Sequence, residues 1–180
     1  MLAAMKFRAL VAAVLALAAL SAPAHAQTPP SSERPRVVVE LYTSQGCSQC
    51  PRANRLLGVF SREPGVLALT FPVGIWDYLG WRDTLAQPDF GERQREYSVA
   101  LHVRGRFTPQ LVFNGVRQST ASDWDDARLA LDASRNDPTP GDAVEVSIAR
   151  LSDGRVRVTL PRNLNAAGTI IWILAFDPTP

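Results

Sequence analysis

Hydrophobic positions in the first half of the chain follow a strand, helix, strand pattern. Residues 36–43 form an apolar, β-branched run without clean alternation, which predicts a strand buried on both faces, as in a parallel sheet. Over residues 48–60 apolar side chains recur at helical spacing, with Pro51 in the first turn, where a missing N–H costs nothing. Residues 66–73 predict a second strand, interrupted near its end by Pro72.

The pattern continues with a helix and a hairpin. Residues 88–101 have helical character, and residues 110–113 predict a third strand. Asn114-Gly115 is a strong hairpin turn into a short fourth strand at 116–117. Strands that alternate with helices in this way favour an α/β fold.

A last helix and a β-rich end complete the chain. Ser122 is expected to cap a helix that runs to about residue 134. Two alternating runs at 143–151 and 156–160 predict a hairpin that turns at Asp153-Gly154. Residues 169–176 are very apolar and predict a final strand.

The first 26 residues have the pattern of a secretory signal peptide. Lys6 and Arg8 form a basic start, residues 9–20 are apolar, and Ala24-His25-Ala26 is a small-residue cleavage site. The apolar run has 12 residues, whereas a membrane-spanning helix needs about 20. Cleavage after Ala26 is therefore favoured over retention as an anchor, and we expect a periplasmic or secreted protein without a membrane contact after cleavage.

Removal of the signal peptide changes the charge of the protein. The remaining chain carries 17 basic residues, all Arg, against 17 Asp and Glu, so that its formal net charge is zero. No basic block remains that would attract a nucleic acid, and we expect no nucleic-acid partner.

Cys47 and Cys50 are the candidate catalytic residues. Cys47 is expected just before the helix and Cys50 in its first turn, where the partial positive charge of the helix N-terminus would stabilise a Cys47 thiolate. Cys50 would then resolve a mixed disulfide formed by Cys47, which gives a reversible two-electron switch. Cys47 is therefore expected to be exposed and Cys50 shielded. A Cys-x-x-Cys pair between a buried strand and a helix is typical of thioredoxin-like redox sites.

Three alternatives to a redox site exist for this pair. A purely structural disulfide remains open, although so short a loop constrains the unfolded chain little. A zinc site needs about four ligands, and His102 is the one His after the signal peptide, so zinc is disfavoured. Copper is less demanding, and Cys47, Cys50 and His102 could form a three-ligand site.

Other residues are expected to support the dithiol. Thr108-Pro109 immediately precedes the third strand, where a thioredoxin site needs a cis proline that faces the dithiol. Glu40 lies in a doubly buried strand, where a charge is costly unless it is paired. It could accept the Cys50 proton, with a pKa raised by burial, or it could simply pair with an Arg.

Residues 74–82 predict an aromatic-rich loop between the second strand and the next helix. Trp76, Asp77, Tyr78 and Trp81 could form a substrate-binding lip. The alternative is a packed cap over the core, which the sequence favours slightly.

Thirteen consecutive residues, Val39 to Pro51 (VELYTSQGCSQCP), resemble the signature of a family of secreted bacterial thioredoxin-like proteins that is known only as a domain of unknown function. The later stretches 76–81 (WDYLGW) and 108–110 (TPQ) match that family in the same order. The resemblance implies a thioredoxin-like fold and a location in the cell envelope. It implies no substrate.

The chain departs from the family pattern at several positions. The family usually has His and Asp where this chain has Pro72 and Gly74, which puts an acid–base or metal role of that loop in doubt. It usually has Pro at Arg52 and an acid at Asn54, and it continues further after the final strand. We therefore expect an incomplete β-rich region with an exposed apolar edge at 170–176.

The fold class is thus expected to be α/β, a thioredoxin-like fold with a C-terminal β-rich extension. The expected parts are a signal peptide at 1–26, a flexible leader at 27–35, the thioredoxin-like domain at 36–135, a linker at 136–142 and the β-rich extension at 143–180. The favoured function is thiol–disulfide exchange on a protein or small thiol substrate, without a cofactor. A non-catalytic binding module with a locked disulfide and a copper-binding envelope protein are the alternatives.

Overall fold

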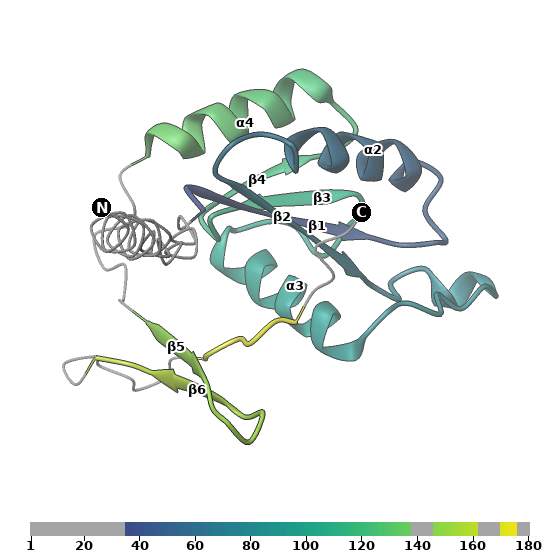
Figure 1. The fold of residues 1–180 in the computed structure, drawn as a ribbon. Helices are drawn as coiled ribbons and strands as arrows, with labels where there is room; N and C mark the ends of the chain where they lie inside the picture. The colour runs from purple at the N-terminus through teal and green to yellow at the C-terminus, as the bar shows by residue number, and fades with distance from the viewer. Residues whose placement is uncertain (1–34, 138–145, 162–169, 176–180) are drawn as a thin grey trace, which may run out of the picture. The chain divides into compact units, whose positions relative to one another are not determined.

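The computed structural model describes residues 35–137, 146–161 and 170–175. The expected signal peptide and most of the expected linker lie outside these ranges. Figure 1 shows the elements of the described chain in order. They are β1 (Val37–Thr43), α2 (Cys50–Phe60), β2 (Val66–Pro72), a 3₁₀ turn η1 (Asp77–Leu79), α3 (Pro88–Ala100), β3 (Gln110–Phe113), β4 (Arg117–Thr120), α4 (Trp124–Asn136), β5 (Ser147–Arg150) and β6 (Val156–Thr159).

The central sheet has four strands in the order β2-β1-β3-β4. β1 pairs with β2 in parallel, whereas β3 is antiparallel to both β1 and β4. Pro72 is tolerated because β2 is an edge strand, where a missing N–H breaks no ladder on the outer side. Helices α2 and α4 lie on one face of this sheet and α3 on the other (Figure 1). This connectivity and strand order are those of the thioredoxin-like fold, which confirms the expected fold class.

Each face of the sheet has its own core, and β1 contributes to both, as expected for a doubly buried strand. Val37, Val39 and Leu41 pack with the helices α2 and α4. Val38 and Tyr42 pack on the opposite face, where α3 lies. Successive side chains of a strand point to opposite faces, so the residue number alone decides which helix a β1 side chain meets.

The hairpin and the last helix of the domain form close to their expected positions. Asn114 and Gly115 both have positive φ angles, 50° and 72°, as the two central residues of a type I′ turn require. The cap of α4 is not Ser122, as predicted, but Asp123, whose carboxylate accepts the backbone N–H groups of Asp125 and Asp126. A carboxylate at this position also favours the positive end of the helix dipole.

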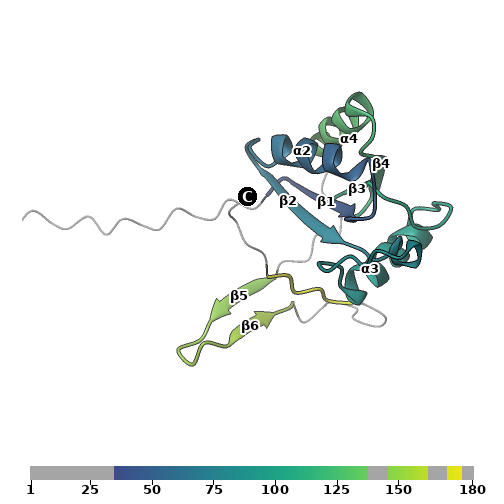
Figure 2. The same cartoon turned by 90° about the vertical axis from the view of Figure 1, so that its right-hand side faces the viewer.

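The C-terminal region is partly as predicted. β5 and β6 pair as an antiparallel hairpin with Gly154 in its turn (Figure 2). The final strand predicted at 169–176 is wrong for its described part, because residues 170–175 form no strand. An apolar run becomes a strand only when a partner strand satisfies its backbone. The side chain of Trp172 instead stacks on the guanidinium of Arg93, 5.2 Å from its ring centroid.

Ile170 and Ile173 are 62% and 72% exposed, but they form no strand edge, since residues 170–175 are not a strand. Among the described residues, none of the helices has the length and apolar character that crossing a membrane would require.

Candidate redox site

Cys47 and Cys50 form a disulfide at the start of α2, with their Cα atoms 5.4 Å apart. Cys50 is the first residue of the helix, and its side chain is 1% exposed. Cys47 precedes the helix and is 9% exposed. Cys50 is shielded, as predicted, whereas the prediction of an exposed Cys47 is wrong, because Cys47 is also buried in the disulfide. The neighbouring Ser48 and Gln49 are exposed.

The turn that carries Cys47 is built by short-range hydrogen bonds after β1. The backbone N–H of Cys47 donates to the carbonyl of Ser44, and the N–H of Gly46 donates to the Ser44 hydroxyl. A Cβ atom on Gly46 would lie 3.0 Å from the Cβ of Trp76. Glycine therefore allows the aromatic loop to pack against the residue directly before Cys47.

The start of α2 favours a negative charge on Cys47. The first turn contains no acidic residue, and the N-cap Gln49 makes no capping hydrogen bond with its side chain. The side chain of Gln49 instead accepts a hydrogen bond from the Ser122 hydroxyl, just before α4. The backbone N–H groups of Cys50, Arg52 and Ala53 donate to the carbonyls of Cys47 and Gln49. The dipole of the helix is therefore what favours a thiolate before the helix.

The Thr108–Pro109 peptide bond is cis, as predicted. Pro109 is buried, and its carbonyl accepts the N–H of Ala121 where β3 begins. The indole N–H of Trp76 donates to the hydroxyl of Thr108 over 2.8 Å. Trp76 therefore contacts both the residue before Cys47 and the residue before the cis proline.

The aromatic loop is not the packed cap that the sequence slightly favoured. Trp76 is half-buried, but Tyr78 and Trp81 are 76% and 65% exposed. Asp77 is structural: its carboxylate accepts the backbone N–H of Asp83 over 3.0 Å. The loop thus has an inner half that packs and an outer half that faces solvent.

Glu40 does not act on Cys50, which corrects one of the two hypotheses. Its carboxylate is buried, at 3% exposure, and receives two hydrogen bonds of 2.7 and 2.8 Å from Arg93 on α3. The hydroxyls of Tyr42 and Tyr97 donate to it as well. These contacts place Glu40 on the α3 face of the sheet, whereas Cys50 begins a helix on the other face. Glu40 is a paired structural charge.

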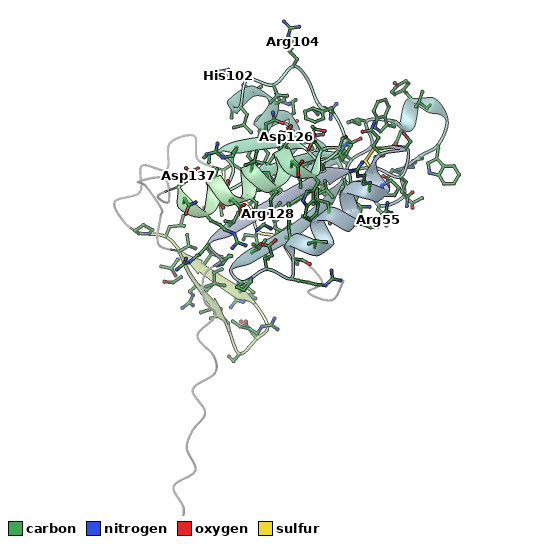
Figure 3. All side chains as sticks on the ribbon, turned by 90° about the horizontal axis from the view of Figure 1, so that it is seen from above. Arg55, His102, Arg104, Asp126, Arg128 and Asp137 are labelled. Atoms are coloured by element: carbon green, nitrogen blue, oxygen red, sulfur yellow. A yellow bond between two sulfur atoms is a disulfide. The ribbon has the colours of Figure 1, made fainter. Side chains whose placement is uncertain are left out.

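The proposed copper site is not formed. His102 follows α3 with a φ angle of 53° and is exposed. Figure 3 shows it near Arg104, whose side chain points away from the body of the molecule. Across residues 35–137, 146–161 and 170–175, no three His, Cys, Asp or Glu side chains are grouped so that they could hold a metal ion.

The sequence reasoning missed Asp83, which is 3% exposed. One carboxylate oxygen accepts the N–H of Gln45, two residues before Cys47, over 2.7 Å, and the other accepts the N–H of Leu85 over 2.9 Å. Asp83 therefore ties the aromatic loop to the dithiol turn. The available signal was an Asp in a loop, because Asp side chains often accept the backbone N–H of the residue two positions later. This predicts the bond from Leu85 but not the bond from Gln45.

The buried amides of Gln94 and Gln110 were also missed. Gln94 donates to the carbonyl of Phe107, next to Thr108, and to the side chain of Gln110. Both are fully buried. They position the backbone that leads into the cis proline.

A family match extends over residues 38–179, and the family is described as "Protein of unknown function (DUF1223)". The chain belongs to this family. The match confirms the resemblance drawn from the sequence, and the family's description gives no activity.

Two solved structures are similar to this DUF1223 chain. The crystal structure of protein AGR_C_4864 from Agrobacterium tumefaciens is 36% identical, with a TM-score of 0.59 over 72% of this chain and 58% of that one. The chain thus spans less than two thirds of that protein. The thioredoxin Mala s 13 of Malassezia sympodialis is 17% identical, with a TM-score of 0.37 over 57% of this chain and 77% of that one. No curated protein matches the chain.

Proposed function

We propose that this DUF1223 protein is a thiol–disulfide oxidoreductase that works through Cys47 and Cys50. The observation that carries the proposal is the disulfide itself, which closes the start of α2 in a thioredoxin-like sheet. Two further features support it. Cys47 is the more exposed sulfur-bearing residue, and the first helical turn carries no acid that would oppose a thiolate.

The exchange proceeds in two balanced steps. A substrate thiolate attacks the Sγ atom of Cys47, a bond forms between the two sulfurs, and the Cys47–Cys50 bond breaks. Cys50 leaves with the electron pair and takes a proton from water. A second substrate thiolate then attacks the substrate sulfur of the mixed disulfide and releases Cys47 as a thiolate. The substrate loses two electrons, the protein gains them, and the reverse order reduces a substrate disulfide.

The proposal includes export to the periplasm or the outside of the cell. An oxidising compartment is where a disulfide persists and where such an enzyme meets its substrates. The support is the signal-peptide pattern of residues 1–26. Exported protein should begin at Gln27, which N-terminal sequencing measures. An exported product that still begins at Met1 or Leu2 would contradict cleavage.

Trapping of a mixed disulfide tests the function. In a Cys50→Ala variant the Cys47 thiolate can attack a substrate disulfide, but the resolving thiol is absent, so the substrate should remain bound to Cys47 and migrate with it on a non-reducing gel. The matched control is Cys47→Ala, which keeps one thiol but removes the attacking sulfur, and it should trap nothing. Equal trapping by both variants would contradict the assignment of Cys47 as the sulfur that bonds to the substrate and Cys50 as the resolving thiol. No adduct with either variant would favour the locked-disulfide binding module.

The binding module remains the second candidate because Cys47 is only 9% exposed in the disulfide. A disulfide that is shielded from attacking thiols would serve structure rather than exchange. The two accounts predict different reduction behaviour of the same bond.

A further inference from the structure

Four large apolar side chains stand exposed on the loop between β2 and α3. Tyr78 is 76% exposed, Trp81 65%, Leu79 64% and Leu85 59%. We call these four residues the apolar lip. Isolated apolar side chains on a surface are ordinary, but a group of them, aromatic ones included, is typical of an interaction site.

The lip carries little charge. The two carboxylates of this segment, Asp77 and Asp83, point into the loop, where they accept backbone N–H groups. Arg82 is the one exposed ionic side chain between Asp77 and Leu85. The surface therefore suits an apolar partner and has no feature that would select an acidic or basic one strongly.

The lip is anchored to the dithiol turn. Asp83, between Trp81 and Leu85, accepts the N–H of Gln45, two residues before Cys47. On the inner side, Trp76 packs against Gly46 and donates to Thr108 before the cis proline. A partner that rests on the lip would therefore contact a loop that is tied to the turn before Cys47. The backbone of this loop is fixed by hydrogen bonds before binding, which reduces the entropy cost of binding.

We propose that the apolar lip receives an extended, apolar segment of a protein chain that has not completed folding and that carries the thiols or the disulfide to be exchanged. The inference rests on the proposed function and names its substrate class. Cysteine and the large apolar residues are among the most buried in folded proteins. Apolar side chains that flank a cysteine are therefore accessible together in a chain that is still unfolded, and they distinguish such a chain from a small thiol.

The experiment compares three thiol substrates of the oxidised protein. The first is a synthetic peptide with two Cys residues flanked by Leu, Val and Phe. The second has Ser, Asn and Gly in place of those residues and the same charge, and the third is glutathione. The variant is Tyr78→Ser/Trp81→Ser, and the control is Leu129→Ser on α4, which is 68% exposed and outside the lip.

We expect the lip variant to lower kcat/KM for the apolar peptide by about tenfold, as loss of an aromatic binding contact does. Rates with the polar peptide and glutathione should stay within about twofold, and Leu129→Ser should match the wild type for all three substrates. An unchanged rate with the apolar peptide would overturn the proposal. An equal fall with glutathione would do the same, because it would indicate damage to the dithiol.

Binding separates this inference from the proposed function. A Cys47→Ser/Cys50→Ser protein should bind the fluorescently labelled apolar peptide, measured by anisotropy, and lose that binding on Tyr78→Ser/Trp81→Ser even if the wild type exchanges no thiol. Absence of binding would overturn the proposal that the apolar lip receives such a segment. A wild-type dimer in sedimentation that dissociates on the same substitutions would also overturn it, since a second copy would then be the occupant.

Discussion

Glu40 shows how a buried charge is accommodated in this fold. Its carboxylate is shared by Arg93, Tyr42 and Tyr97, so that four polar side chains satisfy one another between the sheet and α3. The ring of Tyr97 also lies 5.0 Å from the Arg93 guanidinium. Such a network holds α3 on the sheet at one position. Its role is structural, and its failure should appear in stability rather than in thiol chemistry.

Glu40→Gln should therefore lower the free energy of unfolding by about 3 kcal/mol, because it leaves the Arg93 side chain, which is only 16% exposed, without its counter-charge. The rate at which Cys47 of the reduced protein is alkylated should keep its pH dependence. Glu92→Gln is the matched control, because the Glu92–Arg95 pair is exposed and its loss should leave the free energy of unfolding nearly unchanged. Urea denaturation measures both. A shifted alkylation profile in Glu40→Gln would restore a role for Glu40 at the dithiol.

The tyrosines of this network predict a pH dependence. Burial, and then the negative charge of Glu40, raises the pKa of both Tyr42 and Tyr97 well above the ordinary value. The unfolded chain therefore loses these protons first, at a pH of about 10. Their contribution to stability is complete below that pH and declines as the pH rises above it.

Urea midpoints should accordingly fall as the pH rises above about 10. A Tyr42→Phe/Tyr97→Phe protein should lack this tyrosine contribution and show a smaller decline. Ultraviolet difference spectroscopy should find both phenols protonated in the folded wild type at that pH. Ionisation of both before unfolding would contradict the burial that we describe.

At the scale of elements, the aromatic loop depends on a close approach of Gly74 and Asp77. A Cβ atom at position 74 would lie 2.7 Å from a carboxylate oxygen of Asp77. The same carboxylate holds the N–H of Asp83, which in turn binds the dithiol turn. The absence of a side chain at Gly74 therefore allows the Asp77 carboxylate to remain where it accepts the N–H of Asp83.

Gly74→Ala should displace the Asp77 carboxylate and cost about 1 kcal/mol through the lost hydrogen bond. Backbone amides from Asp77 to Leu85 should then exchange faster with solvent, as hydrogen-exchange mass spectrometry measures. The control is Gly58→Ala in α2, where an added Cβ meets nothing within 4 Å. This substitution should stabilise the helix by up to about 1 kcal/mol. Unchanged exchange in Gly74→Ala would show that Asp77 does not hold the loop.

The elements that the sequence predicted well are those with local signals. The strand at 37–43, the helix after Cys50 and the Asn114-Gly115 hairpin follow from periodicity and turn chemistry within a few residues. The side of the sheet on which Glu40 lies could not be predicted, because it depends on where α3 packs. The bond from Asp83 to Gln45 joins residues 38 positions apart, and no local pattern encodes it. The strand predicted over the apolar run at 170–175 does not form, and the sequence does not show whether a partner strand is available to such a run.

For the whole molecule, the thioredoxin-like sheet separates two tasks. The α3 face is closed by the Glu40 network and by an apolar core. The other face carries α2, which has the disulfide at its first turn. Trp76 links this turn to the cis proline, because it packs against Gly46 and donates to Thr108. Glu40 therefore lies on the α3 face of β1, whereas the Cys47–Cys50 disulfide lies at the start of a helix on the opposite face.

The central claim is that the Cys47–Cys50 bond is a reversible redox couple, and its reduction potential tests that claim most directly. The protein is equilibrated with dithiothreitol or glutathione buffers of known potential, and the free thiols are counted by alkylation and mass spectrometry. The account predicts a single two-electron transition with a midpoint above about −300 mV. A midpoint below that value would be that of a structural disulfide and would contradict the account.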